Sequence, residues 1–209
     1  MKKLFCILLV LGLTIITSGY LSAASASTVY TSEADFVAAL DSYYLEDFDN
    51  ISMTGSEGPA LLEMGPVNGF SYTMKVNDSY LYYCDGAMSA WNDTDAITVE
   101  FTGDSVTAFG GIFWPTDVNT NGLQGDVTVE ISFVDGSTYS YLIEDADAST
   151  FTGFTSSVAI SSFTFDDTMS EYPTVDHLYA GSAAPVPIPG ALYLLGSGLL
   201  GMVFCRRKQ

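Results

Sequence analysis

The clearest structural signal in the chain is the segment Asp126-Val127-Thr128-Val129-Glu130-Ile131-Ser132-Phe133-Val134-Asp135-Gly136-Ser137-Thr138-Tyr139-Ser140-Tyr141-Leu142-Ile143. Apolar and polar residues alternate before the Asp135-Gly136 pair, and β-prone residues follow it. Alternation with a period of two places every second side chain on the same face of a strand. An Asp-Gly pair between two such runs predicts a β-hairpin, because glycine accepts the backbone angles of a tight turn.

The same pattern continues in both directions from this hairpin. Turn residues recur every 8–12 positions between short β-prone runs, which is typical of an all-β sandwich. Ser32 can cap a helix over residues 33–41, with Glu33 and Asp35 in its first turn. About nine short strands with one short N-terminal helix predict a mainly β fold, an antiparallel jelly-roll-like β-sandwich over residues 27–182. The other expected strands are residues 28–30, 44–48, 70–76, 80–84, 96–101, 105–113, 151–154, 158–165 and 175–179.

The charges are strongly sorted along the chain. Residues 27–184 contain one basic residue, Lys75, and all 25 acidic residues, which gives a formal charge of −24. A surface of this sign repels phosphate backbones, so nucleic acid is not expected as a partner. The excess of carboxylates has two readings, a soluble exported surface or a set of ligands for divalent cations.

The sequence offers no recognisable catalytic motif. Cys84 and His177 are the single cysteine and the single histidine between the two terminal segments, and neither has a local motif typical of a nucleophile or its base. A Cys84/His177 pair is conceivable, but Tyr82-Tyr83-Cys84 has the character of a strand. No cysteine and histidine spacing suits zinc. The chain is therefore expected not to be an enzyme.

The N-terminus has the three parts of a secretory signal peptide. Lys2 and Lys3 are followed by an apolar run from Leu4 to Ile16 and then by small residues ending at Ala26. This order predicts that residues 1–26 direct the chain to the secretion translocon and are removed by signal peptidase. Residues 27 onward are then expected outside the inner membrane.

The C-terminus has a proline-rich entry, an uncharged apolar segment and a basic end. Residues 190–205 carry no charge, and as a helix they would span about 24 Å at ~1.5 Å per residue, a little less than a hydrocarbon core of about 30 Å. Arg206, Arg207 and Lys208 would stop transfer and stay cytoplasmic. The sequence thus predicts a marginal C-terminal transmembrane helix.

These features together resemble a known sorting signal. Val186-Pro187-Ile188-Pro189, the glycine-rich segment with Gly196, Ser197 and Gly198, and the basic residues 206–208 are similar to a PEP-CTERM signal in its Val-Pro-x-Pro variant, over residues 183–209. The resemblance implies that an exosortase, a membrane processing enzyme, cuts the chain. It also implies transient anchoring by the helix, then release to the cell surface or extracellular matrix of an exopolysaccharide producer. A plain C-terminal anchor is the alternative.

The region between the signals has a second, looser resemblance. The short N-terminal helix leading into Asp47-Phe48, the Gly-rich strand 109–113 and the final strand 172–179 look like domains found on PEP-CTERM proteins, which are similar to carbohydrate-binding sandwiches. Such modules imply a structural Ca²⁺ held by positions matching Glu46, Asp47, Asp49 and Asp176. Separate, solvated carboxylates are the alternative.

Aromatic residues offer platforms for sugar rings. Trp91 next to Asn92, and Trp114 beside the polar loop of residues 116–125 with Asn119, are the best candidates for glycan binding, with core packing as the alternative. The expected function is therefore that of a non-enzymatic surface or matrix protein, associated with exopolysaccharide or biofilm. A secreted hydrolase acting on extracellular polysaccharide is the alternative, and paired carboxylates carry no information among so many acids.

Overall fold

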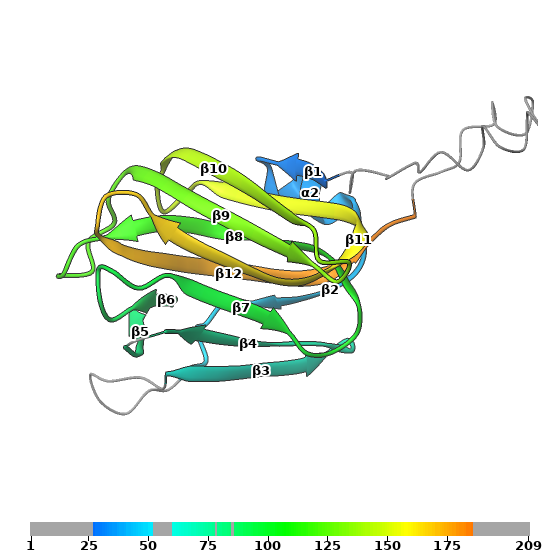
Figure 1. The fold of residues 1–209 in the computed structure, drawn as a ribbon, viewed down its shortest axis with the longest axis horizontal. Helices are drawn as coiled ribbons and strands as arrows, with labels where there is room; N and C mark the ends of the chain where they lie inside the picture. The colour runs from blue at the N-terminus through cyan, green and yellow to red at the C-terminus, as the bar shows by residue number, and fades with distance from the viewer. Residues whose placement is uncertain (1–26, 52–59, 78, 85, 186–209) are drawn as a thin grey trace, which may run out of the picture.

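The computed structural model of the protein describes residues 27–51, 60–77, 79–84 and 86–185. These residues form twelve β-strands and one short helix (Figure 1). In chain order the elements are β1 Ser27–Tyr30, α2 Glu33–Ala38, β2 Leu40–Glu46, β3 Leu61–Val67, β4 Phe70–Val76, β5 Leu81–Cys84, β6 Ala87–Ala90, β7 Ile97–Phe101, β8 Val106–Thr116, β9 Gly125–Phe133, β10 Thr138–Ala146, β11 Phe151–Asp167 and β12 Tyr172–Ala183.

The predicted hairpin is confirmed as β9 and β10. Ser132 lies opposite Thr138, and the turn between the strands contains Val134, Asp135 and Gly136. Gly136 has a φ of 84° and donates its N–H to the Phe133 carbonyl at 3.0 Å. Turns of three residues with a left-handed glycine are typical of hairpins, which explains the Asp-Gly signal. The Asp135 carboxylate accepts hydrogen bonds from the N–H and the hydroxyl of Ser137, at 2.9 and 2.6 Å.

Strand β11 joins the parts of the sheet. Its first half pairs with β1 and β8, and its second half pairs with β7 and β9. One path of neighbours, β3-β4-β7-β11-β8-β12-β6-β5, therefore runs through the whole molecule, and all its pairings are antiparallel. The sheet curls until it is nearly barrel-shaped, with its strands along the long axis of the molecule (Figure 1).

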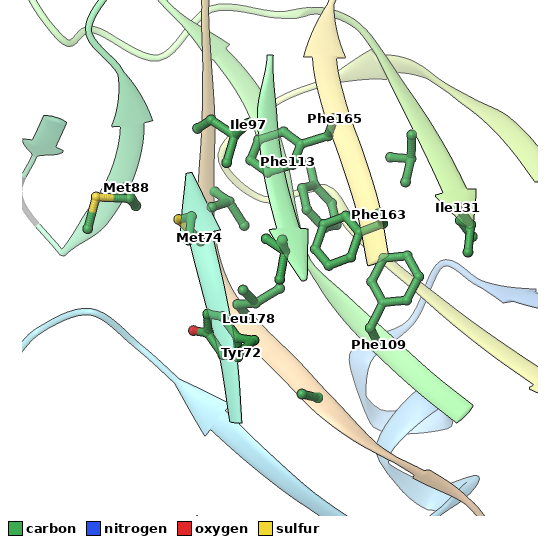
Figure 2. Packing of buried hydrophobic residues seen from close by; sticks show 14 of the residues in the cluster. Tyr72, Met74, Met88, Ile97, Phe109, Phe113, Ile131, Phe163, Phe165 and Leu178 are labelled. Carbon is green, nitrogen blue, oxygen red and sulfur yellow. The ribbon is translucent and has the colours of Figure 1, made fainter. Parts of the chain in front are cut away.

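Aromatic rings fill the space inside the curled sheet. Phe163 of β11 stacks on Phe109 of β8, with ring centroids 4.1 Å apart and an interplanar angle of 9°, and Phe113 and Phe165 pack beside them (Figure 2). All four rings are fully buried. Their positions on β8 and β11 place one face of each strand in the core, and burial of the rings favours folding.

A smaller cluster holds the helix against the sheet. Ser32 caps α2 by accepting the Asp35 N–H at 3.4 Å, and Phe36 on the helix packs against Tyr30, Phe151 and Tyr179. The helix is shorter than the predicted range of residues 33–41, since Leu40 already pairs with Ala183 in the sheet. Tertiary pairing thus ends the helix three residues early.

The first and last strands of the described chain end at the same side of the molecule. β1 pairs with the first half of β11 near α2, and Ala184 at the end of β12 donates its N–H to the Ala39 carbonyl at 2.8 Å (Figure 1). β12 starts at the other end of the molecule, next to β5 and β6. The described chain therefore begins and ends at the same end of the molecule.

The predicted fold class is confirmed at the level of a mainly β, antiparallel architecture with one short helix. The expected strands 151–154 and 158–165 are one continuous strand, β11, and β3 and β6 were not predicted. No helix among the described residues is long and apolar enough to cross a membrane. The predicted signal peptide, residues 1–26, and the predicted transmembrane helix, residues 190–205, lie outside the described residues.

Candidate glycan-binding groove

A groove of about 340 Å³ is lined by residues of β5, β6 and the loop after β8. These elements lie at the end of the molecule opposite residues 27 and 185 (Figure 1). The β5–β6 hairpin forms one wall, the loop after β8 forms the other, and the start of β12 closes it. The lining residues are Tyr82, Ser89, Ala90, Trp91, Asn92, Thr116, Asp117, Val118, Thr120 and Tyr172. Three aromatic rings and several hydrogen-bonding groups thus converge on one concave surface.

Trp91 is the exposed aromatic residue of this groove. Its side chain is 40% exposed, and its ring packs against Tyr82 with centroids 5.5 Å apart and an interplanar angle of 57°. The backbone N–H of Trp91 donates to the Tyr80 carbonyl at 2.9 Å, which fixes the end of the hairpin. A ring held in this way offers a preformed apolar face to a ligand.

Asp117 places a negative charge on the opposite wall. Its Oδ1 accepts the backbone N–H groups of Asn119 and Asn121 at 2.8 and 2.9 Å, and its Oδ2 accepts the Asn121 side-chain amide at 2.9 Å. These hydrogen bonds, from Asn121 above all, lower the pKa of Asp117 below its usual range. The carboxylate is therefore ionised at neutral pH, a form that accepts hydrogen bonds and donates none.

A chain of buried hydroxyl groups supports the floor of the groove. The Thr116 and Thr174 hydroxyls lie 2.9 Å apart, the Thr174 hydroxyl donates to Ser89 at 3.0 Å, and Ser89 donates to the Pro173 carbonyl at 3.2 Å. These bonds connect β8, β12 and β6 side by side. Satisfied buried networks of this kind favour one arrangement of the strands that carry them.

The structure separates the three residues predicted to bind glycan. Trp91 lines the groove, whereas Trp114 is only 8% exposed and belongs to the interior. Asn119 lies on the exposed loop beside Asp117 but does not line the groove. Tyr82, Tyr172 and Asp117 were not predicted, because they meet only when the unpredicted strand β6 pairs with β12. One signal in the sequence could have identified Tyr82 as a groove residue: Tyr82 and Trp91 are aromatic residues on either side of the same turn.

The four residues predicted to hold Ca²⁺ have separate partners. The Glu46 carboxylate accepts the Tyr44 hydroxyl and the Phe48 N–H, and the Asp176 carboxylate pairs with its neighbour His177, at 2.9 Å from Nδ1. Asp47 accepts the N–H of Asp49 at 3.3 Å. Within the described ranges, no three acidic, histidine or cysteine side chains gather as metal ligands. The calcium site at these positions stays a prediction.

The conceivable Cys84/His177 pair also stays untested. Cys84 is at the end of β5, and its side chain lies outside the described part of the structure. His177 interrupts the pairing of β12 with β8, with a φ of 49°, and its imidazole is directed to Asp176. The predicted sorting residues, from Val186 to Lys208, lie outside the described residues as well.

Comparison with protein-family models, with curated proteins and with solved structures finds no match to this chain. The groove is therefore interpreted from its own residues.

Proposed function

We propose that this chain is an exported, non-enzymatic protein that binds polysaccharide at the cell surface or in the extracellular matrix. The observation that carries the proposal is the groove itself, which is lined both by the exposed Trp91 and by the ionised carboxylate of Asp117. Sugar rings combine apolar faces, which stack on aromatic rings, with hydroxyl groups, which donate to carboxylates. We also propose that the curled sheet is a jelly-roll-like sandwich, with β11 joining its two faces.

The proposed route to the surface rests on the resemblance of the C-terminus to a PEP-CTERM signal. Val186, Pro187, Ile188 and Pro189 would reach an exosortase in an extended form, because proline disfavours helix. The translocon and signal peptidase would act on the N-terminus. Deletion of residues 186–189 is expected to leave the protein in the membrane fraction, and normal release would refute this route.

The binding proposal is tested by replacing Trp91. The full-length chain, its Trp91→Ala variant and a control are mixed with insoluble exopolysaccharide from the producing cells and sedimented. Loss of a central aromatic anchor is expected to weaken binding roughly tenfold, or about 1.4 kcal/mol. Tyr43→Ala is a matched control, since Tyr43 is 37% exposed and packs on Tyr179 with the same 5.5 Å and 57° geometry, outside the groove.

The same mixtures separate binding from hydrolysis. Co-sedimentation without new reducing ends supports the binding function. New reducing ends that disappear in Asp117→Asn would overturn it in favour of a hydrolase. Equal binding by wild type and Trp91→Ala would show that the groove is not the glycan site.

A further inference from the structure

Two buried aspartates, Asp95 and Asp167, lie just beyond the last printed pair of β7 and β11. Ile97 of β7 lies opposite Phe165 of β11, and both point into the core (Figure 2). Because side chains on a strand alternate, Asp95 and Asp167, two positions further on, extend the same inward face. Directly opposed residues of an antiparallel pair have Cβ atoms only about 4.5–5.5 Å apart. Asp95 and Asp167 are thus expected to be neighbours across the strands.

Both carboxylates are buried and incompletely bonded. Asp95 is 5% exposed and Asp167 is 9% exposed, and the Oδ2 atom of each is buried without a hydrogen-bond partner. The other oxygen of Asp167 accepts the N–H groups of Met169 and Glu171, at 2.6 and 3.0 Å. Leaving a buried acceptor unpaired is costly, and more so for a charged group. The Oδ2 atoms of Asp95 and Asp167 are therefore expected to bind a ligand that supplies the missing partner.

Residues 27–185 have no spare basic side chain for these two carboxylates. Between residues 27 and 185 the sequence contains a single lysine and no arginine. That lysine, Lys75, forms an ion pair with Glu100, at 2.7 Å, and His177 is directed to Asp176. Neighbouring Asp166 on the other face of β11 adds further negative charge. Any cation that pairs with Asp95 or Asp167 is therefore expected to come from solution.

We propose that Asp95 and Asp167 bind one calcium ion. Ca²⁺ accepts hard carboxylate oxygens together with backbone carbonyls and waters in a flexible shell, so two carboxylates can nucleate a site. Mg²⁺ demands a rigid octahedral shell and loses its waters reluctantly, which suits a buried pair less well. The site differs from the one predicted at Glu46, Asp47, Asp49 and Asp176.

The ion would stabilise the two loops that connect Asp95 and Asp167 to residues of the groove. Asp95 closes a turn by donating its N–H to the Asn92 carbonyl at 3.4 Å, and Asn92 lines the groove. The turn bonded to Asp167 leads directly to Tyr172, another groove residue. An effect of calcium on polysaccharide binding would rest on the proposed function, whereas calcium binding itself does not.

Calorimetry and thermal melting of the full-length chain in a mild detergent test the site. After treatment with chelator, wild type is expected to bind one Ca²⁺ with a Kd on the order of 10⁻⁴–10⁻³ M, the range of extracellular modules. Asp95→Asn and Asp167→Asn are each expected to weaken binding by at least about tenfold, since a ligand charge is lost. Asp41→Asn, which removes an exposed charge on β2, is expected to bind as wild type does.

The melting temperature supplies a second readout that a purely structural role would not produce. In chelator, Asp95→Asn is expected to melt above wild type, because the repulsion between opposed carboxylates is relieved. In millimolar Ca²⁺ the wild type gains stability and the variant does not. Asp167→Asn also weakens a turn. If Asp167→Asn fails to fold for this reason, the melting temperatures of Asp95→Asn alone test the proposal.

Three results would overturn the proposal. The first is an absence of calcium binding by wild type at 10-fold above the highest expected Kd, about 10⁻² M. The second is calcium affinity in Asp95→Asn equal to that of wild type. The third is stabilisation of wild type by acid alone, without a response to Ca²⁺, which would identify a shared proton instead. A chain that binds calcium but no polysaccharide would retain this inference and lose only the proposed function.

Discussion

Asp166 shows how strongly single carboxylates influence one another in this chain. Burial raises its pKa above the ordinary value, and the negative charges of Asp167 and Asp95 raise it further. A raised pKa in the folded state means that ionisation opposes folding. Asp166 therefore contributes its full stability only below the unfolded-state pKa of about 3.9, and this contribution is lost as the pH rises through the folded-state value.

Replacement of Asp166 by asparagine tests this effect. In chelator at pH 7, Asp166→Asn is expected to increase the free energy of unfolding by less than about 1 kcal/mol, because solvent screens a partly exposed charge. The gain should disappear near pH 3, where the native side chain is also neutral. Urea unfolding at both pH values measures it. A variant less stable than wild type at pH 7, or one with the same advantage at pH 3, would contradict the assigned cause.

At the scale of elements, α2 depends on a glycine in β11. Gly153 lies opposite Gly110 of β8, and a Cβ at Gly153 would come within 2.5 Å of the Phe36 ring. The helix can rest on the sheet only because this position has no side chain. The fit explains why Phe36 is fully buried on a helix of six residues.

Gly153→Ala is expected to destabilise the protein by about 1–3 kcal/mol, the usual cost of overpacking a filled core. Chemical denaturation of the full-length chain measures the change. Gly122→Ala is the control, since its Cβ would meet only ordinary contacts, the nearest at 3.5 Å from the Trp114 ring. Equal stability of the two variants would show that α2 is not held tightly at Phe36.

Some elements could be predicted from sequence and others could not, for identifiable physical reasons. β4 and the β9–β10 hairpin alternate clearly, and the predicted bounds of β4, residues 70–76, are those of the structure. β6, Ala87-Met88-Ser89-Ala90, is buried at every position, so no alternation of apolar and polar residues marks it. β3 contains Gly65-Pro66, which argues locally against a strand. The polar run Thr155-Ser156-Ser157 hid the continuity of β11.

The groove could be predicted only in part for the same reason. Trp91 beside the polar residue Asn92 was visible in the sequence, but the residues that line the groove with it come from β5, β12 and the loop after β8. Such non-local pairing is fixed by the whole sheet. The proposed pair Asp95 and Asp167 shares this property, because the two residues lie 72 positions apart and follow the last pair of the β7–β11 register, Ile97 and Phe165.

The charge of the whole molecule leads to a further prediction. With a formal charge of −24 over residues 27–184, the folded state repels itself. Raising NaCl from 0.01 to 0.15 M shortens the Debye length from about 30 Å to about 8 Å. The melting temperature in chelator is therefore expected to rise by at least about 2 °C, or roughly 0.5–1 kcal/mol.

Choline chloride at equal ionic strength separates screening from sodium binding, since its bulky cation cannot enter a carboxylate site. An equal rise with both salts is expected from screening. A melting temperature that is independent of salt would show that the carboxylates are already neutralised by bound ions or protons.

The length of β12 determines the distance between the groove and the end of the described chain. Its twelve residues run from Tyr172 at the groove to Ala183 beside α2, a rise of about 36 Å at ~3.3 Å per residue. A force applied to the chain beyond residue 185 would therefore act at the end of the domain opposite the groove. If the proposed polysaccharide ligand were held in the groove, stretching would load the hydrogen bonds of β12 to β8 and β2 in shear rather than open them one at a time.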